Sequence, residues 1–157
     1  MLQNTLRRFQ MEIKKILFPT DFMEGTAQAI PYAVDLAKKY GAKLYIFHVI
    51  FEVTRASGLY VPHVTLDDLY KNMKTEAEKE IKKVYIEELR GFEDVEYVVV
   101  KGVPYEEIIN FAEDKGIDLI VIGTHGRKGL DRLFFGSTAE KVIKQAQCPV
   151  MTVRVKG

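Results

Sequence analysis

Residues 119–138 read L-I-V-I-G-T-H-G-R-K-G-L-D-R-L-F-F-G-S-T. The first four form a short apolar run rich in β-branched side chains, which is typical of a buried parallel strand. Beyond the stretch, apolar residues recur at i, i+3, i+4 and i+7 and predict the inner face of a helix: Ala139, Val142, Ile143 and Ala146. The stretch therefore joins the carboxyl end of a strand to a helix start. In an open α/β sheet, ligands bind at that edge.

The loop inside this stretch has the composition of a phosphate-binding site. Gly123, Gly126 and Gly136 let the backbone approach a ligand closely or adopt a positive φ. Ser137 and Thr138 follow them, with hydroxyls and unpaired amides at the positive end of a helix dipole. Basic side chains outnumber acidic ones, with His125, Arg127, Lys128 and Arg132 against Asp131. The alternative is a plain turn in which Ser137 is only an N-cap.

The bulk composition narrows the class of protein. A chain of 157 residues fits one domain. Its formal net charge of +1 creates no general attraction to nucleic acid or to an acidic membrane, and no apolar run reaches the length of a membrane span. We therefore expect no nucleic-acid partner, no membrane partner and a cytoplasmic location. Residues 1–12 lack the apolar core of a secretory signal, so we expect an N-terminal tail followed by a domain over 13–157.

Strand-like and helix-like segments alternate along the chain, which predicts a doubly wound parallel α/β sheet. The expected strands are 13–19, 43–50, 95–101, 119–123 and 150–155, and the expected helices are 26–40, 65–90, 104–116 and a last one after Gly136. Pro31 lies inside the first helix and is expected to cost a hydrogen bond or kink its first turns. The long second helix has a core stripe at Leu66, Leu69, Tyr70, Met73, Ala77, Ile81, Val84 and Leu89.

Two further positions can contribute to a nucleotide site. Asp21 follows the first strand and can take a ribose hydroxyl, an adenine amine or Mg²⁺ beside the phosphates, although a turn-forming or capping aspartate is the alternative. Val49, at the end of the second strand, can offer backbone groups to an adenine ring. His125 can contact a phosphate or act as an acid or base, or it can be a solvated loop histidine. The sequence has no G-x-x-x-x-G-K-[ST] loop and no G-x-G-x-x-G after the first strand.

These residues resemble the universal stress protein family. Gly123, Gly126, Gly136 and Ser137 match its nucleotide motif G-x2-G-x9-G-[ST]. K-I-L-F-P-T-D at 15–21, A-V-D-L-A-K-K-Y-G-A-K-L at 33–44, F-H-V at 47–49 and C-P-V at 148–150 are similar to its other blocks. The resemblance covers about residues 13–155. It implies a five-stranded parallel sheet of order 3-2-1-4-5 with helices on both faces.

The same resemblance implies a set of ATP-binding residues, because the intact motif is that of the ATP-binding branch. They are Pro19, Thr20, Asp21, Val49, Ile122, Gly123, His125, Gly126, Arg127, Gly136, Ser137 and Thr138. Mg²⁺ is expected on the ATP phosphates, with Asp21 as a candidate ligand. The implied function is a nucleotide-dependent signalling or stress-response role with little or no hydrolysis. A slow ATPase or an adenylyl-transferring enzyme using the same pocket is the alternative.

The last strand is expected to lie at the edge of the sheet and to pair with a second copy. Residues 150–154 read V-M-T-V-R, and an edge strand with exposed apolar side chains invites pairing. A homodimer through Val150, Met151, Thr152, Val153 and Arg154 would cover both edges at once, as the resemblance also implies. The alternative is a monomer whose edge is guarded by Arg154 and Lys156.

Overall fold

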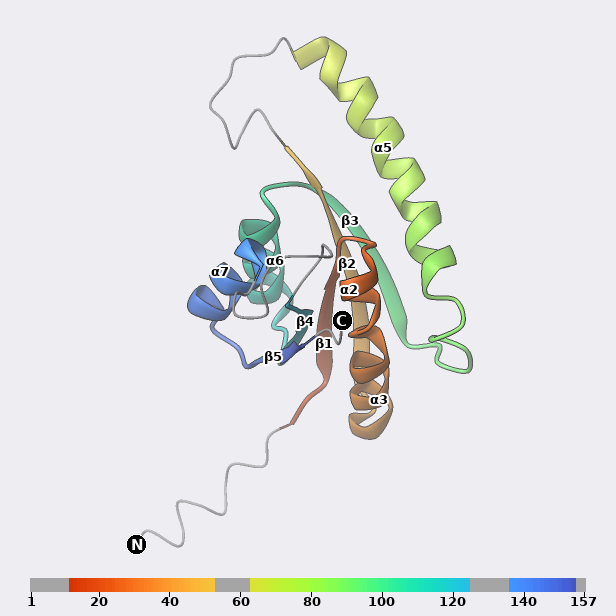
Figure 1. Ribbon diagram of the computed structural model, residues 1–157, viewed down its shortest axis with the longest axis vertical. Coiled ribbons are helices and arrows are strands. Elements are labelled where there is room, and N and C mark those ends of the chain that lie inside the picture. The colour runs from red at the N-terminus through yellow and green to blue at the C-terminus, as the bar shows by residue number, and fades with distance from the viewer. Residues whose placement is uncertain (1–11, 53–62, 125–135, 155–157) are drawn as a thin grey trace, which may run out of the picture.

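Five parallel strands form one sheet in the order β3-β2-β1-β4-β5 (Figure 1). This computed structural model describes residues 12–52, 63–124 and 136–154. The strands are β1 (Lys15–Thr20), β2 (Lys43–Phe51), β3 (Val95–Gly102), β4 (Leu119–Gly123) and β5 (Val150–Val153). The predicted fold class and strand order are therefore confirmed. Residues 1–11 and Val155 lie outside the described residues.

Helices cover both faces of the sheet, as predicted. They are α2 (Glu24–Ala27), α3 (Ile30–Tyr40), α5 (His63–Val84), α6 (Pro104–Lys115) and α7 (Ser137–Gln145). In Figure 1, α2, α3 and α5 lie on one side of the sheet, and α6 and α7 lie on the other. Successive strand residues point to opposite faces. Ile16 and Phe18 accordingly pack in the core beneath α3 and α5, whereas Leu17 packs in the core beneath α6 and α7.

The predicted first helix, 26–40, is two helices instead of one. The chain leaves helical geometry after Ala27 and resumes it at Ile30, so that Pro31 falls in the first turn of α3. The missing N–H of proline costs nothing there, because amides in a first turn have no intrahelical acceptor. The expected kink is thus replaced by a break just before the proline. Gly41 ends α3 with a φ of 62°, in the left-handed region.

The predicted helix 65–90 begins earlier and ends sooner. It runs from His63 to Val84, and the chain then forms a series of turns. Its predicted core stripe is only partly buried: Ile81 is fully enclosed, but Leu69 and Met73 are 52% and 43% exposed. The start of α5 extends past the carboxyl ends of the strands (Figure 1), so less of the sheet lies beneath that part of the helix. The expectation that the whole stripe is core was wrong there.

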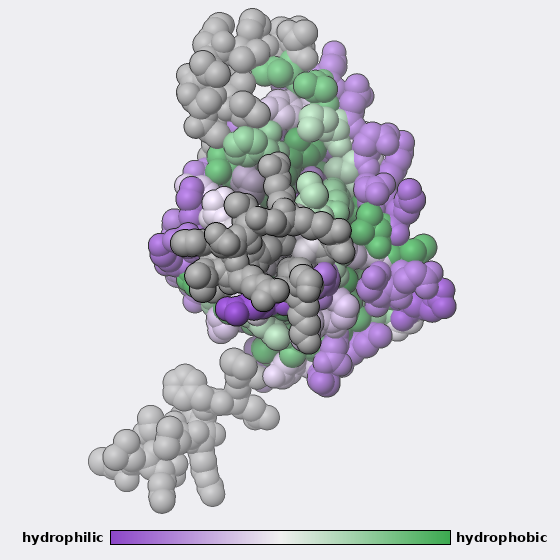
Figure 2. Space-filling model, in the orientation of Figure 1, coloured by the Kyte–Doolittle hydropathy of each residue, from purple (hydrophilic) through white to green (hydrophobic). Residues whose placement is uncertain are grey.

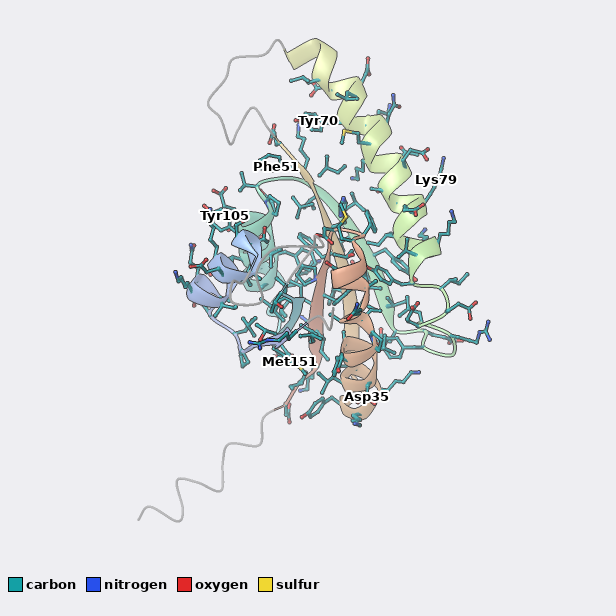
Figure 3. All side chains as sticks on the ribbon, in the orientation of Figure 1. Asp35, Phe51, Tyr70, Lys79, Tyr105 and Met151 are labelled. Carbon is teal, nitrogen blue, oxygen red and sulfur yellow. The ribbon has the colours of Figure 1, made fainter. Side chains whose placement is uncertain are left out.

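The two sides of α5 differ in chemistry. Tyr70 lies on the side that faces the sheet, and Lys79 points away from it (Figure 3). In Figure 2 the right-hand border, where α5 runs, is mostly hydrophilic. Salt bridges between residues three or four apart, Lys79 with Glu76 and Lys74 with Glu78, lie on this surface. The outer side of α5 is therefore a solvated helix surface.

Candidate nucleotide site at the carboxyl edge of the sheet

Four chain segments meet at one edge of the sheet. β1 ends at Thr20, which lies beside His48 of β2, and β4 ends at Gly123. α7 starts beside the end of β4, because the Gly136 amide donates to the carbonyl of Thr124 at 2.7 Å. Since parallel strands all end at the same edge, the predicted β1 turn and the predicted phosphate-binding residues lie on one side of the molecule.

Asp21 forms the turn that follows β1. Its Oδ1 accepts the backbone N–H of Met23 at 2.9 Å and the hydroxyl of Thr26 at 2.5 Å. The capping role that the sequence left open for Asp21 is therefore present in the fold. The side chain is also exposed to solvent, so its second oxygen remains accessible for a ligand. Phe22, next in the chain, has a φ of 63°, an uncommon value for a residue with a side chain.

The Thr20 hydroxyl points into the protein. It is buried, accepts the Phe22 amide at 3.1 Å and hydrogen-bonds the phenol of Tyr85. Burial raises the pKa of Tyr85 to about 12, so the phenol stays protonated near neutral pH. The Thr20 side chain is therefore engaged within the protein. Tyr85 is a residue that sequence reasoning missed, although it continues the i, i+4 spacing from Ile81.

His48 supports the same turn from β2. Its Nδ1–H donates to the Thr20 carbonyl at 2.8 Å, and its ring stacks against Phe22 with centroids 4.3 Å apart. Burial lowers the pKa of the imidazole below its ordinary value, so the ring is neutral near pH 7. Neighbouring groups thus hydrogen-bond both the carbonyl and the hydroxyl of Thr20, and they also hydrogen-bond the Asp21 carboxylate. The β1 turn is held in one conformation.

Pro19, Val49 and Ile122 share one face of the sheet. Val49 and Ile122 pack with the core beneath α6 and α7, and Pro19 lies on the same face as Leu17 by strand alternation. Pro19 and Ile122 are buried, and Val49 is half-buried. The structure brings these three apolar residues to the side of the sheet on which α7 lies.

Gly123 and Gly136 lie in tight surroundings within the protein, and neither adopts a positive φ. A Cβ on Gly123 would lie 3.2 Å from the Gly25 carbonyl and 3.3 Å from the Thr26 Cα. A Cβ on Gly136 would lie 3.3 Å from the Thr124 carbonyl. Neither glycine is among the described residues with positive φ. Because Gly123 has no side chain, α2 can pack against the end of β4. Because Gly136 has none, the start of α7 can pack against Thr124.

Thr124 is the second residue that sequence reasoning missed. Its amide donates to the Val153 carbonyl at 3.1 Å, and its own carbonyl receives the Gly136 amide. Its buried hydroxyl also donates to Val153, at 3.4 Å. Thr124 thereby joins β4, β5 and α7 at the point where the glycine-rich loop leaves the sheet. A threonine directly after the strand-ending glycine was the available signal.

Ser137 and Thr138 begin α7, as predicted. Gly136 is the N-cap and makes no side-chain capping bond, so the structure does not support the reading of Ser137 as a mere N-cap. Amides in the first turn of a helix lack intrahelical acceptors and point along the positive end of the dipole. Among the described residues, no acceptor meets the Ser137 or Thr138 amide. His125, Gly126 and Arg127 lie outside the described residues.

Comparison with known proteins identifies the family. Residues 12–154 match the universal stress protein family. The chain belongs to this family. It is 37% identical over 155 residues to universal stress protein MJ0531 of Methanocaldococcus jannaschii, covering 98% of this chain and 89% of that protein. The solved structure of MJ0577, from the same organism, superimposes with a TM-score of 0.80 at 32% identity and covers 93% of this chain and 99% of its own.

A third comparison concerns the ligand of a more distant protein. A universal stress protein solved in complex with cAMP has a TM-score of 0.60 and 22% identity, covering 91% of this chain and 98% of that one. At that identity the likeness shows the shared fold. It establishes that a protein of this fold accommodates an adenine nucleotide.

In the described part of the chain, no group of three or more histidine, cysteine, aspartate or glutamate side chains could hold a metal ion. None of the described helices combines the length and apolar character that a membrane span needs. Cytoplasmic location stays a prediction.

Proposed function

We propose that this universal stress protein binds ATP at the carboxyl edge of its sheet. The observation that carries the proposal is the juxtaposition of two complementary groups. The exposed Asp21 carboxylate suits the hydroxyl and amine hydrogens of a nucleoside, and the amides at the start of α7 suit phosphate oxygens. Both lie at one edge of the sheet, where open α/β folds bind ligands.

The proposal assigns parts of the nucleotide to parts of the edge. Pro19, Val49 and the backbone of Thr20 would lie against adenine and ribose, with Asp21 on a polar hydrogen of either. Ile122, Gly123 and Gly126 would line the ribose and phosphates, with His125 and Arg127 nearby. Gly136, Ser137 and Thr138 would receive the phosphate tail. Mg²⁺ would enter on the ATP phosphates, with Asp21 as a candidate ligand.

We further propose that the nucleotide acts as a signal in a stress response and is hydrolysed slowly or not at all. The sequence lacks the P-loop lysine that supports efficient phosphoryl transfer. A slow ATPase or an adenylyl-transferring activity remains the alternative use of the same edge. Turnover measured on the purified protein separates the two. A rate near the ~10 s⁻¹ of a typical enzyme would favour the alternative.

The proposal includes a homodimer formed through β5. This strand pairs only with β4 among the described strands, so its outer edge is open. The carbonyls of Pro149 and Val153 point to β4, so by strand alternation the backbone groups of Val150 and Thr152 point outward. The apolar side chains are less exposed than the sequence suggested, because Val153 is buried and Val150 and Met151 pack on the core. The proposed dimer is therefore supported by the open backbone edge of β5 and less by its apolar side chains.

A charge placed at the start of α7 tests the phosphate assignment. Ser137 is exposed, and an acidic side chain in a first helical turn favours the helix dipole, so Ser137→Asp should leave the fold intact. The new carboxylate should repel the phosphates and weaken ATP binding at least about tenfold, equivalent to about 1.4 kcal/mol. Adenosine, which has no phosphate, should bind as it does to the wild type.

The matched control is Thr75→Asp, which places the same charge on the outer surface of α5. It should bind ATP with wild-type affinity in the same calorimetric titration. Equal ATP affinity for Ser137→Asp and the wild type would contradict the assignment of the phosphates to α7.

A further inference from the structure

Thr26 links the two ends of the candidate site. It lies in α2, the short helix between the β1 turn and α3. Its side chain donates to Asp21 Oδ1 at 2.5 Å, and its Cα would lie 3.3 Å from a Cβ on Gly123. The same residue therefore touches the carboxylate at the proposed nucleoside end and packs against the glycine from which the phosphate-binding loop leaves β4.

The hydroxyl of Thr26 has a specific acceptor. The residue is 7% exposed, and a buried hydroxyl without a hydrogen bond is costly. A hydrogen bond to an ionised carboxylate is shorter and stronger than one between neutral groups. The 2.5 Å contact with Asp21 fits that class, so Thr26 restrains the aspartate strongly.

The two carboxylate oxygens of Asp21 have different surroundings. Oδ1 is engaged from inside the turn by the Met23 amide and the Thr26 hydroxyl. The side-chain hydrogen bonds that Asp21 accepts within the described ranges both end on Oδ1, and the residue is exposed. With one oxygen held, rotation about the Asp21 side chain is restricted and the other oxygen is presented to solvent in a fixed direction. Such preorganisation reduces the entropy lost when a ligand binds.

We propose that Thr26 is a positioning residue for the nucleoside half of the site. It fixes the Asp21 carboxylate so that Oδ2 accepts a hydroxyl or amine hydrogen of the nucleoside, and it ties this carboxylate to the end of β4. The inference rests on the proposed function, because it assumes that a nucleoside lies at Asp21. It adds a residue to the site and commits Asp21 to the nucleoside instead of to Mg²⁺.

Substitution of the Thr26 hydroxyl tests the proposal. Thr26→Val has nearly the same shape and lacks the donor, and the packing against Gly123 uses the Cα, which both residues share. We expect the affinities for adenosine and for ATP to fall by the same factor, about fivefold or more, because one shared contact is loosened. Thr26→Ser, which keeps the hydroxyl, should recover most of the loss. Thr75→Val, at an exposed threonine of α5, should bind both ligands as the wild type does.

Several results would overturn the proposal. Wild-type affinity of Thr26→Val, or a loss confined to ATP, would show that the hydroxyl does not act on the nucleoside. Failure of Thr26→Ser to recover binding would point to packing instead of the hydrogen bond. In an Asp21→Ala background, Thr26→Val should add no further loss, and an additive loss would also contradict the proposal.

Amide hydrogen exchange separates this proposal from the proposed function. The Met23 amide is bonded to the same Asp21 oxygen, so Thr26→Val should accelerate its exchange and Thr26→Ser should not. If the wild type bound neither adenosine nor ATP, the proposed function would fail while the Met23 result still reported whether Thr26 holds Asp21. Unchanged Met23 exchange in Thr26→Val would refute the positioning role.

Discussion

At the scale of single residues, the β1 turn is fixed by partners from distant parts of the sequence. Tyr85 reaches the Thr20 hydroxyl from the turn after α5, and His48 reaches the Thr20 carbonyl from β2. These contacts join groups 65 and 28 positions apart in the chain. They leave the Asp21 carboxylate as the exposed polar side chain of the turn. The groups of the β1 turn that a ligand can contact are therefore positioned by residues, Tyr85 and His48, that do not themselves face the ligand.

His48 should make stability depend on pH. Burial lowers the pKa of its folded-state imidazole, so as pH falls the unfolded chain takes up the proton first. The stability that neutral His48 provides is present above its unfolded pKa of about 6.5 and is lost as pH falls through and below that value. We expect the wild-type Tm to drop from pH 7.5 to pH 5.5.

The matched variant is His48→Asn, whose amide can donate to the Thr20 carbonyl but does not titrate. Its Tm should fall less than that of the wild type over the same range, as measured by circular dichroism. Equal falls in the two proteins would mean that His48 is not the group responsible.

At the scale of elements, the sequence predicted the strands and helix ends best where a local rule decides them. Gly41 and Gly116 follow the helix ends in left-handed geometry and Pro104 begins α6, which agrees with the predicted helices 26–40 and 104–116 at these ends. The break before Pro31 and the exposure of Leu69 and Met73 depend on what lies beside the element. Periodicity shows which side of a helix is apolar, but not how far the sheet extends beneath it.

The two halves of α5 should differ in their contribution to stability. Ile81→Ala removes a fully buried side chain and should lower the free energy of unfolding by about 2–5 kcal/mol. Leu69→Ala removes an exposed side chain on the same predicted stripe and should change it by no more than about 0.5 kcal/mol. Urea denaturation measures both. Similar losses for the two variants would show that the first half of α5 is packed after all.

The candidate site was predictable in place but not in detail. The motif placed Ser137 and Thr138 at a helix start and Asp21 at a strand end, and the structure has them there. Whether a glycine makes room for a ligand or for the protein itself is a tertiary property. Gly123 lies close to the backbone of Gly25 and Thr26, which are far from it in the sequence. Gly136 lies close to the Thr124 carbonyl, in a stretch that the sequence pattern assigned to no helix or strand. Thr26 and Thr124 likewise gain their partners only through the fold.

At the scale of the whole molecule, the open edge of β5 is the proposed contact between two copies. Thr152 is exposed and its backbone N–H points away from β4, so Thr152→Pro removes an outward donor without breaking the pairing inside the sheet. Met151 alternates with Thr152, so its backbone points toward β4 like that of Pro149 and Val153, and proline there would damage the sheet itself. We expect the wild type to be a dimer in light scattering and Thr152→Pro to be mostly monomeric.

Thr152→Val, which keeps the N–H, is the control and should remain dimeric. A wild-type monomer at micromolar concentration would contradict the proposed assembly. A Thr152→Pro protein that stays fully dimeric would place the contact elsewhere.

An NMR titration with ATP and Mg²⁺ locates the surface at which the nucleotide binds. We expect the largest changes in backbone amide shifts at Asp21, Gly123, Ser137 and Thr138, all at the carboxyl edge of the sheet. Lys43 and Asp118, at the amino ends of β2 and β4, should be unaffected. Absence of any shift change at millimolar ATP, or changes centred on the amino edge, would contradict nucleotide binding at the carboxyl edge of the sheet.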